Sequence, residues 1–140
     1  MIDAKMAPTA ALVLRLTMGL MFLREGFYLK IVVYGFAGTG AYFQSLGLPG
    51  WLGDLMAVYE TIGGICLVLG IQTRWVLTFL GLHLLATVLF IRLTRGVGLE
   101  FPVFWAIVCF SLALLGDGAC ALMPSVRPGH PKSFSARQGE

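Results

Sequence analysis

Hydrophobic residues are concentrated in four long stretches of this 140-residue chain, separated by short polar or glycine-rich links. The stretches cover about residues 9–34, 51–71, 75–94 and 99–123, and a helix needs about 20 residues to cross a bilayer. The links "QTR" and "RGVG" are so short that the helices they join must be antiparallel neighbours. The pattern predicts an all-α integral membrane four-helix bundle, with residues 1–123 forming a single domain.

The link between the first two stretches is longer and different in composition. Residues 35–50, "GFAGTGAYFQSLGLPG", are uncharged and glycine-rich, and Tyr42, Phe43 and Leu46 recur at helical spacing. We interpret this link as a short interfacial helix or a re-entrant segment, with an ordinary long loop as an equal alternative. Trp51 and Trp75 fall at predicted span ends, which is typical of the aromatic belts of membrane proteins.

The two ends of the chain indicate its orientation in the membrane. Arg15 interrupts the first apolar run and no A-x-A cleavage site follows, so this run is predicted to be an uncleaved span. Residues 124–140 form a polar, basic tail with prolines, which is expected to be disordered on its own. If both termini share a face, that face carries five bases and the other carries three: Lys5, Arg74, Arg127, Lys132 and Arg137 against Lys30, Arg92 and Arg95. The balance favours cytoplasmic termini and a cytoplasmic tail.

Composition supports a membrane protein and excludes several other classes. The chain is 58% hydrophobic and 12% charged, whereas a soluble domain has about 25% charged residues. The net charge of +3 is weak evidence for a nucleic-acid ligand, because basic residues accumulate in cytoplasmic segments of membrane proteins, so we expect no nucleic-acid partner. Cys66, Cys109 and Cys120 form no CxxC pair and show no ligand spacing with the two histidines, so we expect no metal site. The chain also lacks a P-loop and a dinucleotide-binding fingerprint.

Glu60 lies in the middle of the second apolar stretch, in "YETIGG", where an ionised group costs on the order of 2.5–3.5 kcal/mol on insertion scales. On a helix, Gly53, Ala57 and Gly64 share its face, and small residues let helices approach closely in lipid, so Glu60 is predicted to point into the bundle. Arg24 and His83 fall at about the same depth on their own spans. We therefore predict an ion pair between Glu60 and Arg24. Thr87, one turn from His83, is expected to orient the imidazole.

The first span carries charged residues that point in different directions around an ideal helix, namely Arg15, Arg24, Glu25 and Lys30. Three explanations remain open. Arg15 snorkels to the interface, the helix is irregular near Gly26, or some of these groups face another protein. Gly19 and Gly26 share one face, which predicts a packing seam.

Charged residues also mark the predicted cytoplasmic end of the bundle. Asp117, in "LLGDGA", falls near the end of the fourth span, level with Arg74 and with Arg15. We expect these three residues to form a structural clamp between helix ends.

The candidate buried polar cluster has a structural and a functional interpretation, and its members are Arg24, Glu25, Glu60, His83 and Thr87. The favoured one is a structural ion pair of Glu60 with Arg24, and the alternative is a site that handles protons or a quinone. His83 is expected to be a hydrogen-bonded core residue. A b-type haem held by this chain alone is not expected, because it needs two axial ligands and no second histidine lies in a span.

Several segments together resemble the DoxX family of small bacterial membrane proteins. These are "LRLTMGLMFLREGFYLK", "GFAGTGAYFQSLGLP", "YETIGGICLVLGIQTR", "LEFP" and "LLGDGA", which span about residues 12–120. The most specific part is a glutamate before a glycine pair, an apolar run and a Thr-Arg turn, here Glu60, Gly63, Gly64, Thr73 and Arg74. The resemblance implies a four-helix bundle in the bacterial inner membrane that is linked to redox systems, similar to the small subunit of a thiosulfate:quinone oxidoreductase or of a terminal quinol oxidase.

The chain departs from the family pattern at two positions. Glu25 and Arg92 stand where relatives often carry histidines, although Gly26 and Lys30 are kept. If those histidines serve quinone or metal chemistry in relatives, this chain lacks the side chains for it at these two positions, and the charged replacements indicate an altered interface.

These observations lead to three functional hypotheses. The first is a non-catalytic accessory subunit of a larger membrane redox complex, in contact with lipids and with other membrane subunits, and holding no cofactor by itself. The second is a quinone-interacting oxidoreductase subunit, in which Glu60, Arg24 and His83 bind the head group and move protons. The third and least favoured is a small transporter or channel. An enzyme that works alone is not expected.

Overall fold

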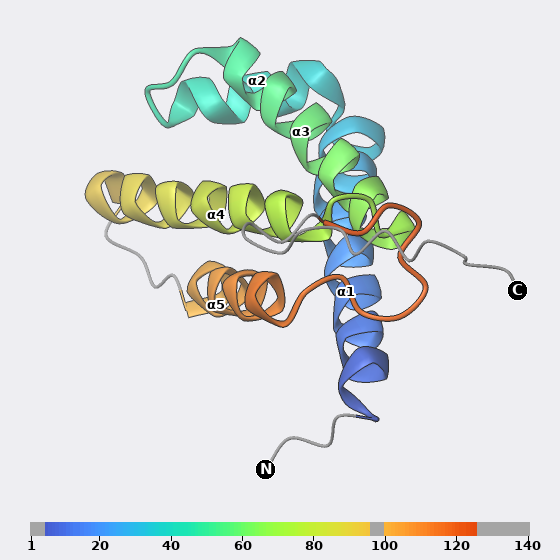
Figure 1. Cartoon of the computed structure of the whole chain (residues 1–140). Coiled ribbons are helices and arrows are strands. Elements are labelled where there is room, and N and C mark those ends of the chain that lie inside the picture. Colours follow the sequence, from blue (N-terminus) through green and yellow to red (C-terminus); the bar gives the residue numbers. More distant parts are fainter. Residues whose placement is uncertain (1–4, 96–99, 126–140) are drawn as a thin grey trace, which may run out of the picture.

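The computed structural model describes residues 5–95 and 100–125, and in these residues the chain is helical (Figure 1). The elements are α1 (Ala7–Leu23), the π-helix η1 (Arg24–Val33), α2 (Gly35–Ser45), α3 (Gly50–Leu69), α4 (Thr73–Arg95) and α5 (Glu100–Leu115). The predicted all-α membrane bundle is confirmed. Most of the predicted tail, with Arg127, Lys132 and Arg137, lies outside the described residues, as do the side chains of Arg92 and Arg95.

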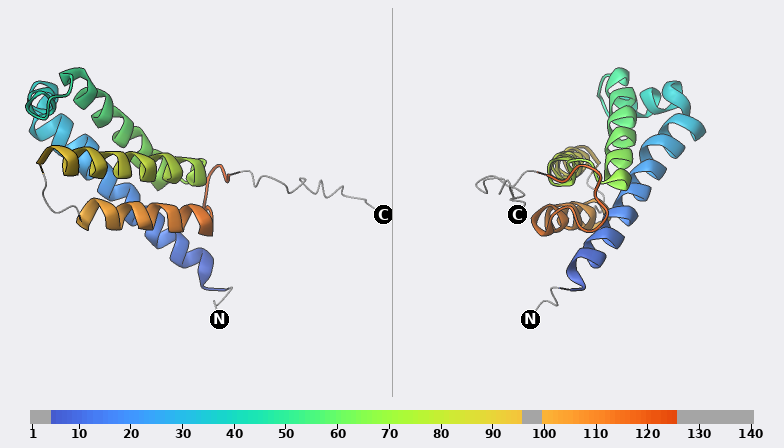
Figure 2. Two further views of the ribbon diagram at one scale, coloured as in Figure 1. Left: turned by 90° about the vertical axis from the view of Figure 1, so that its left-hand side faces the viewer. Right: turned by 45° about the vertical axis from the view of Figure 1, so that its right-hand side comes forward.

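The helices form four long segments, called rods below, and one short helix. The first rod is α1 continued by η1, and it packs against α3, while α4 and α5 run side by side as a second pair (Figures 1 and 2). The short helix α2 packs on η1 and α3 and lies across their shared end (Figure 2). The prediction of a short helix in the first link is thus confirmed, and the alternative of an ordinary loop is wrong.

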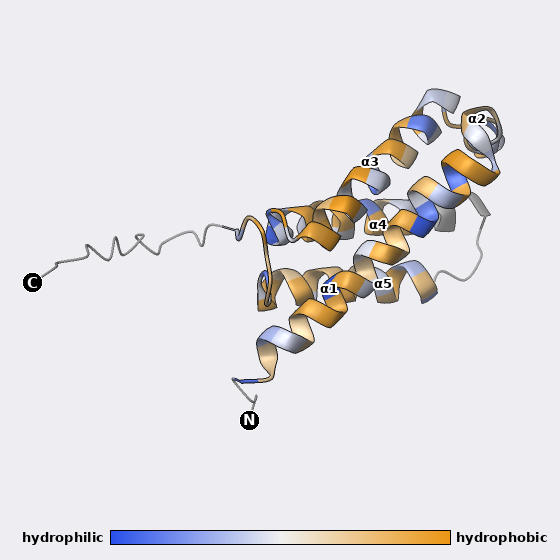
Figure 3. Ribbon diagram, turned by 90° about the vertical axis from the view of Figure 1, so that its right-hand side faces the viewer, coloured by the Kyte–Doolittle hydropathy of each residue, from blue (hydrophilic) through white to orange (hydrophobic). Residues whose placement is uncertain are grey.

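The surface of the bundle is apolar. Among the residues that the structure describes, three helical segments are long and apolar enough to cross a membrane, namely Ala7–Val33, Gly50–Leu69 and Thr73–Phe90. Hydrophobic residues cover the outward faces of the helices (Figure 3), and Leu114 is 82% exposed. Such a surface would drive association in water, whereas in a bilayer it contacts lipid chains.

The fourth apolar helix is shorter than predicted. α5 ends at Leu115, not near residue 123, and its 16 residues span about 24 Å at 1.5 Å per residue. The chain leaves the helix because Gly116 and Gly118 adopt φ values of +102° and +72°, which L side chains rarely adopt.

The segment after α5 folds back onto the turn between α3 and α4. The amide of Gln72 donates to the carbonyl of Met123 at 2.9 Å, and the amide of Met123 donates to the carbonyl of Gly70 at 3.1 Å. The amide of Ala119 donates to the carbonyl of Pro8 at 3.1 Å, which ties this segment to the start of α1. Residues 116–125 therefore close the end of the bundle at which α1 begins.

Small residues set the crossing of α1–η1 with α3. A Cβ atom on Gly26 would lie 2.7 Å from the Cβ of Glu60, and one on Gly64 would lie 2.9 Å from the carbonyl oxygen of Gly19. Both distances are shorter than the contacts that real Cβ atoms make. The first helix and α3 can therefore approach this closely only because glycine has no side chain at these positions. The predicted packing seam and the predicted small-residue face of Glu60 are both confirmed.

Candidate functional site

Glu60 is buried where three rods meet. It lies on α3 with 5% of its surface exposed, beside the crossing point at Gly26. One carboxylate oxygen lies 3.0 Å from Nε2 of His83 on α4, and the other accepts a hydrogen bond from the ammonium group of Lys30 on η1. Because a carboxylate only accepts hydrogen bonds, Nε2 of His83 carries the hydrogen in this contact. The cluster of Glu60, Lys30 and His83 is called the polar triad below.

The predicted ion pair between Glu60 and Arg24 is wrong. Arg24 pairs with Glu25 instead, at 2.6 Å, and the two side chains are 57% and 35% exposed. The reason is the position of Gly26, which faces Glu60. Arg24 is two residues before Gly26 and so points away from Glu60 and pairs with its neighbour Glu25, whereas Lys30 follows one turn later on the same face as Gly26.

The helix that carries Lys30 is irregular, as one of the three explanations predicted. From Arg24 to Val33 it is a π-helix, and the amide of Tyr34 donates to the carbonyl of Leu29, five residues earlier, at 2.9 Å. π-helical turns often occur at functional sites, where they change the direction of side chains. At the end of this segment the hydroxyl of Thr39, on α2, donates to the backbone carbonyl of Lys30 at 2.8 Å.

His83 is oriented by Glu60 and by an aromatic neighbour. The ring of Tyr59 stands edge-on to the imidazole, with 5.6 Å between ring centroids. Thr87 does not orient the ring as predicted, because its hydroxyl donates to the backbone carbonyl of His83 at 3.0 Å. A threonine inside a helix commonly forms this bond with the carbonyl four residues earlier.

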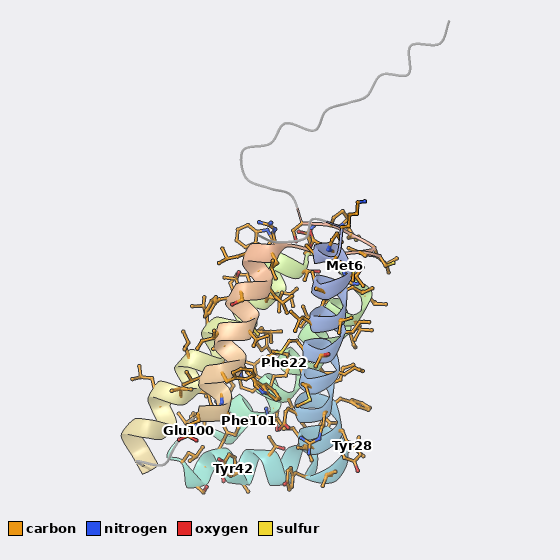
Figure 4. All side chains as sticks on the ribbon, turned by 90° about the horizontal axis from the view of Figure 1, so that it is seen from below. Met6, Phe22, Tyr28, Tyr42, Glu100 and Phe101 are labelled. Atoms are coloured by element: carbon orange, nitrogen blue, oxygen red, sulfur yellow. The ribbon has the colours of Figure 1, made fainter. Side chains whose placement is uncertain are left out.

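The polar triad lies on the wall of a cavity of about 700 Å³. This volume is within the usual range for sites that bind small molecules. Polar lining comes from the triad and from Arg24, Glu25 and Thr87, while most of the remaining wall is apolar. Aromatic rings recur around it, and Figure 4 shows three of them on the first helix, α2 and α5: Phe22, Tyr42 and Phe101.

The charges in the cavity balance one another. Glu60 is paired with Lys30, and Arg24 is paired with Glu25. With a neutral His83, these four charges sum to zero, so the wall does not favour a ligand of high net charge. An ammonium group has three N–H donors and a guanidinium has five, so the paired cations can still donate to a further oxygen atom. The cavity thus suits an uncharged molecule with hydrogen-bond acceptors at one end and an apolar body.

Among the side chains that the structure describes, no three His, Cys, Asp or Glu residues lie close enough together to hold a metal ion. In the described part of the chain Cys109 is buried, Cys66 is half-buried and Cys120 is exposed, and all three are free thiols.

The second predicted cluster lies at the end of the bundle that residues 116–125 close. Arg15 is 2% exposed and donates to the backbone carbonyl of Asp117 at 2.5 Å, so it does not snorkel to the interface. The carboxylate of Asp117 accepts bonds from the amide and the hydroxyl of Ser125, each at 2.8 Å, and the amide of Arg74 donates to the same hydroxyl at 3.1 Å. Arg15 therefore contacts Asp117 directly, and Arg74 reaches Asp117 through Ser125, so the three residues that were expected to form a clamp lie together.

Three residues, Lys30, Thr39 and Ser125, were not predicted to belong to these clusters. Lys30 could have been found, because it follows the predicted seam residue Gly26 by one helical turn. Thr39 and Ser125 had no local signal, since each bonds to a segment that only the tertiary fold brings near.

Comparison with known proteins finds a matching family and relatives in two bacteria. Residues 10–93 match the sequence model of the DoxX family. A Bacillus subtilis (strain 168) protein named "Putative oxidoreductase CatD" is 31% identical over 120 residues, which cover 84% of this chain and 87% of that protein. An Escherichia coli (strain K12) protein named "Inner membrane protein YqjF" is 28% identical over 123 residues, which cover 84% of this chain and 92% of that protein. No solved structure matches the chain.

Proposed function

Because the chain belongs to the DoxX family, we propose that it is a membrane subunit of a quinone-linked oxidoreductase and that it binds the head group of a quinone or quinol in the cavity. The observation that carries this proposal is the position of the polar triad on the wall of an otherwise largely apolar cavity of about 700 Å³. The name of the Bacillus subtilis relative, which calls that protein an oxidoreductase, supports the same class of function.

The chemistry of the wall fits both redox forms of such a ligand. A quinone presents two carbonyl acceptors, and Lys30, Arg24 and His83 are the donors that line the cavity. A quinol presents hydroxyl donors, for which the carboxylate of Glu60 is a buried acceptor. Phe22, Trp105 and their aromatic neighbours provide apolar surface for the ring and the tail.

The proposal is tested by the fluorescence of Trp105, which lines the cavity. In a Trp51→Phe/Trp75→Phe background this residue is the remaining tryptophan of the three in the chain. We expect a short-tailed ubiquinone to quench its emission with a saturable binding curve. Glu60→Gln should weaken binding about tenfold or more, because it breaks a buried charge-assisted network.

A matched control distinguishes the specific effect of changing Glu60 from a general effect of removing one carboxylate charge. Glu100→Gln makes the same chemical change at an exposed residue of α5, and it should leave the binding curve unchanged. Linear, non-saturable quenching in the parent, or equal binding by the parent and Glu60→Gln, would refute the proposal.

A second candidate is the accessory role in a larger redox complex. It is favoured by the pair Arg24–Glu25, which is partly exposed within the first membrane-spanning segment, where contact with lipid is costly and a protein partner would cover it. Native mass spectrometry of the protein extracted from its own membrane tests this role. The accessory role would be supported if other subunits co-purify at fixed stoichiometry with the parent and are lost from an Arg24→Ala/Glu25→Ala variant. A lone chain that retains quinone would contradict it.

We further propose that the protein resides in the bacterial inner membrane with both ends in the cytoplasm. Lys5 and Arg74 lie at the closed end of the bundle, whereas Lys30 lies toward the other end. This distribution agrees with the enrichment of basic residues on the cytoplasmic side. The name of the Escherichia coli relative, an inner membrane protein, supports the same compartment.

A further inference from the structure

Lys30 is held in the polar triad through its backbone as well as through its side chain. It belongs to the last turn of η1, where carbonyl groups lack donors within their own helix. The hydroxyl of Thr39 supplies such a donor at 2.8 Å, and Thr39 is buried. Water therefore cannot readily replace this bond, and the hydroxyl links α2 directly to the residue that carries the ammonium group.

The position of Thr39 is itself fixed by α3, the helix that carries Glu60. A Cβ atom on Gly53 would lie 3.0 Å from the carbonyl oxygen of Thr39 and 2.8 Å from the ring of Phe43. A Cβ atom on Gly50 would lie 3.3 Å from the carbonyl oxygen of Gly40. These glycines let α2 lie directly on α3, so α3 determines the position of Glu60 itself and, through α2, the position of Thr39.

We propose that Thr39 is a positioning residue that holds Lys30 against Glu60, which makes α2 part of the binding site. The same helix places Tyr42 and Phe43 on the wall of the cavity. A molecule that lies against these two rings therefore contacts the element that fixes the Lys30–Glu60 ion pair. The effect on ligand binding rests on the proposed function, whereas the positioning of Lys30 does not.

The test compares variants that differ in one hydroxyl group. Thr39→Val keeps the shape of the side chain and removes the donor, and Thr39→Ser keeps the donor. Thr39→Ala also removes the donor and introduces no new atom. It should therefore give the same result as Thr39→Val, even if the valine side chain disturbs the packing. Thr78→Val is the matched control, because this threonine is half-buried and its hydroxyl donates to a carbonyl of its own helix, that of Arg74.

The first readout is the ammonium signal of Lys30 in protein labelled with ¹⁵N-lysine. The chain has three lysines, and the Lys30 signal is assigned by its absence from Lys30→Arg. We expect a signal protected from solvent exchange in the parent, in Thr39→Ser and in Thr78→Val, and loss of this protection in Thr39→Val and Thr39→Ala. Retained protection in the variants without the hydroxyl would overturn the proposal, as would its loss in Thr78→Val or its absence from the parent.

The second readout is the binding of short-tailed ubiquinone, measured by quenching of Trp105. Thr39→Val should weaken binding by about three- to tenfold, the usual effect of losing one buried hydrogen bond, and Thr39→Ser should restore it. If the parent shows the protected Lys30 signal but binds no quinone, the proposed function fails while the positioning role stands. If quinone binds equally to the parent and to Thr39→Val, Thr39 does not act on the ligand and the binding part of the proposal is overturned.

Discussion

Replacing Gly26 with alanine should destabilise the protein, although alanine is the better helix former. The added Cβ would lie 2.7 Å from the Cβ of Glu60, 2.8 Å from the amide nitrogen of Thr61 and 3.1 Å from the carbonyl oxygen of Ala57. Two of these neighbours are backbone atoms of α3, which cannot rotate away as a side chain can. The variant must therefore push the first rod away from α3 at the point where the polar triad is assembled.

The magnitude follows from two opposing effects. Overpacking at such a contact costs about 1–3 kcal/mol, whereas the change from glycine to alanine within a helix contributes up to about 1 kcal/mol in favour of folding. Because the new contacts are as short as 2.7 and 2.8 Å, the overpacking cost should lie in the upper part of its range, about 2–3 kcal/mol, so Gly26→Ala should lower the free energy of unfolding by roughly 1–2 kcal/mol. The matched control is Gly38→Ala on α2, where the new Cβ would meet only the Cβ of Tyr34, at the ordinary contact distance of 3.4 Å. This control should be neutral or more stable than the parent.

The assay is reversible unfolding in mixed micelles, in which the fraction of dodecyl sulfate is raised and helicity is followed by far-ultraviolet circular dichroism. We expect Gly26→Ala to be less stable than the parent, and Gly38→Ala to be as stable as the parent or more stable. The slope of the unfolding transition should be the same in all three proteins. If Gly26→Ala were as stable as Gly38→Ala, the close crossing of the first rod with α3 would be incorrect, and with it the geometry of the triad.

Two further predictions concern the closed end of the bundle. Ser125→Ala should lower the free energy of unfolding by about 1–3 kcal/mol, because the Asp117 carboxylate and the Arg74 amide, which are partly buried, lose their bonds to the hydroxyl. The same micelle assay measures this change. Ser111→Ala, at an exposed serine, should change stability by less than about 0.5 kcal/mol, and equal effects of the two changes would contradict a structural role for Ser125. Cys120 is exposed at this end, so a membrane-impermeant maleimide should label it in inverted vesicles and not in intact spheroplasts. Cys109 is buried and should stay unlabelled in both preparations. Labelling of Cys120 in spheroplasts would reverse the proposed orientation.

Much of the fold was predictable because membrane helices have strong sequence signals. Long apolar runs predicted the rods, a short link predicted the antiparallel pairing of α4 with α5, and the glycines around Glu60 indicated its inward face. The early end of α5 was also detectable, since Gly116, Asp117 and Gly118 form a typical helix stop. The predicted span nevertheless ran to about residue 123, because it was based on hydropathy and the apolar run continues past Gly118.

The partners within the site were harder to predict. Depth along a span placed Arg24 and His83 level with Glu60, but depth does not say which way a side chain leaves its helix. The close contact at Gly26 decides this for Arg24 and Lys30, and the π-helix alters the geometry beyond it. The bond from Thr39 to Lys30 depends on how α2 is seated on α3, which no local pattern in the chain encodes.

The most direct test of the central claim is to map where a quinone binds. A short-tailed quinone with a photoreactive azide would be cross-linked to the purified protein and the modified residues identified by mass spectrometry. The predicted result is modification of cavity residues such as Met56, Leu84 and Trp105, competed by unmodified quinone and reduced in Glu60→Gln. Modification spread over outward-facing residues such as Leu20 and Leu114, with no competition, would contradict a quinone site in this cavity.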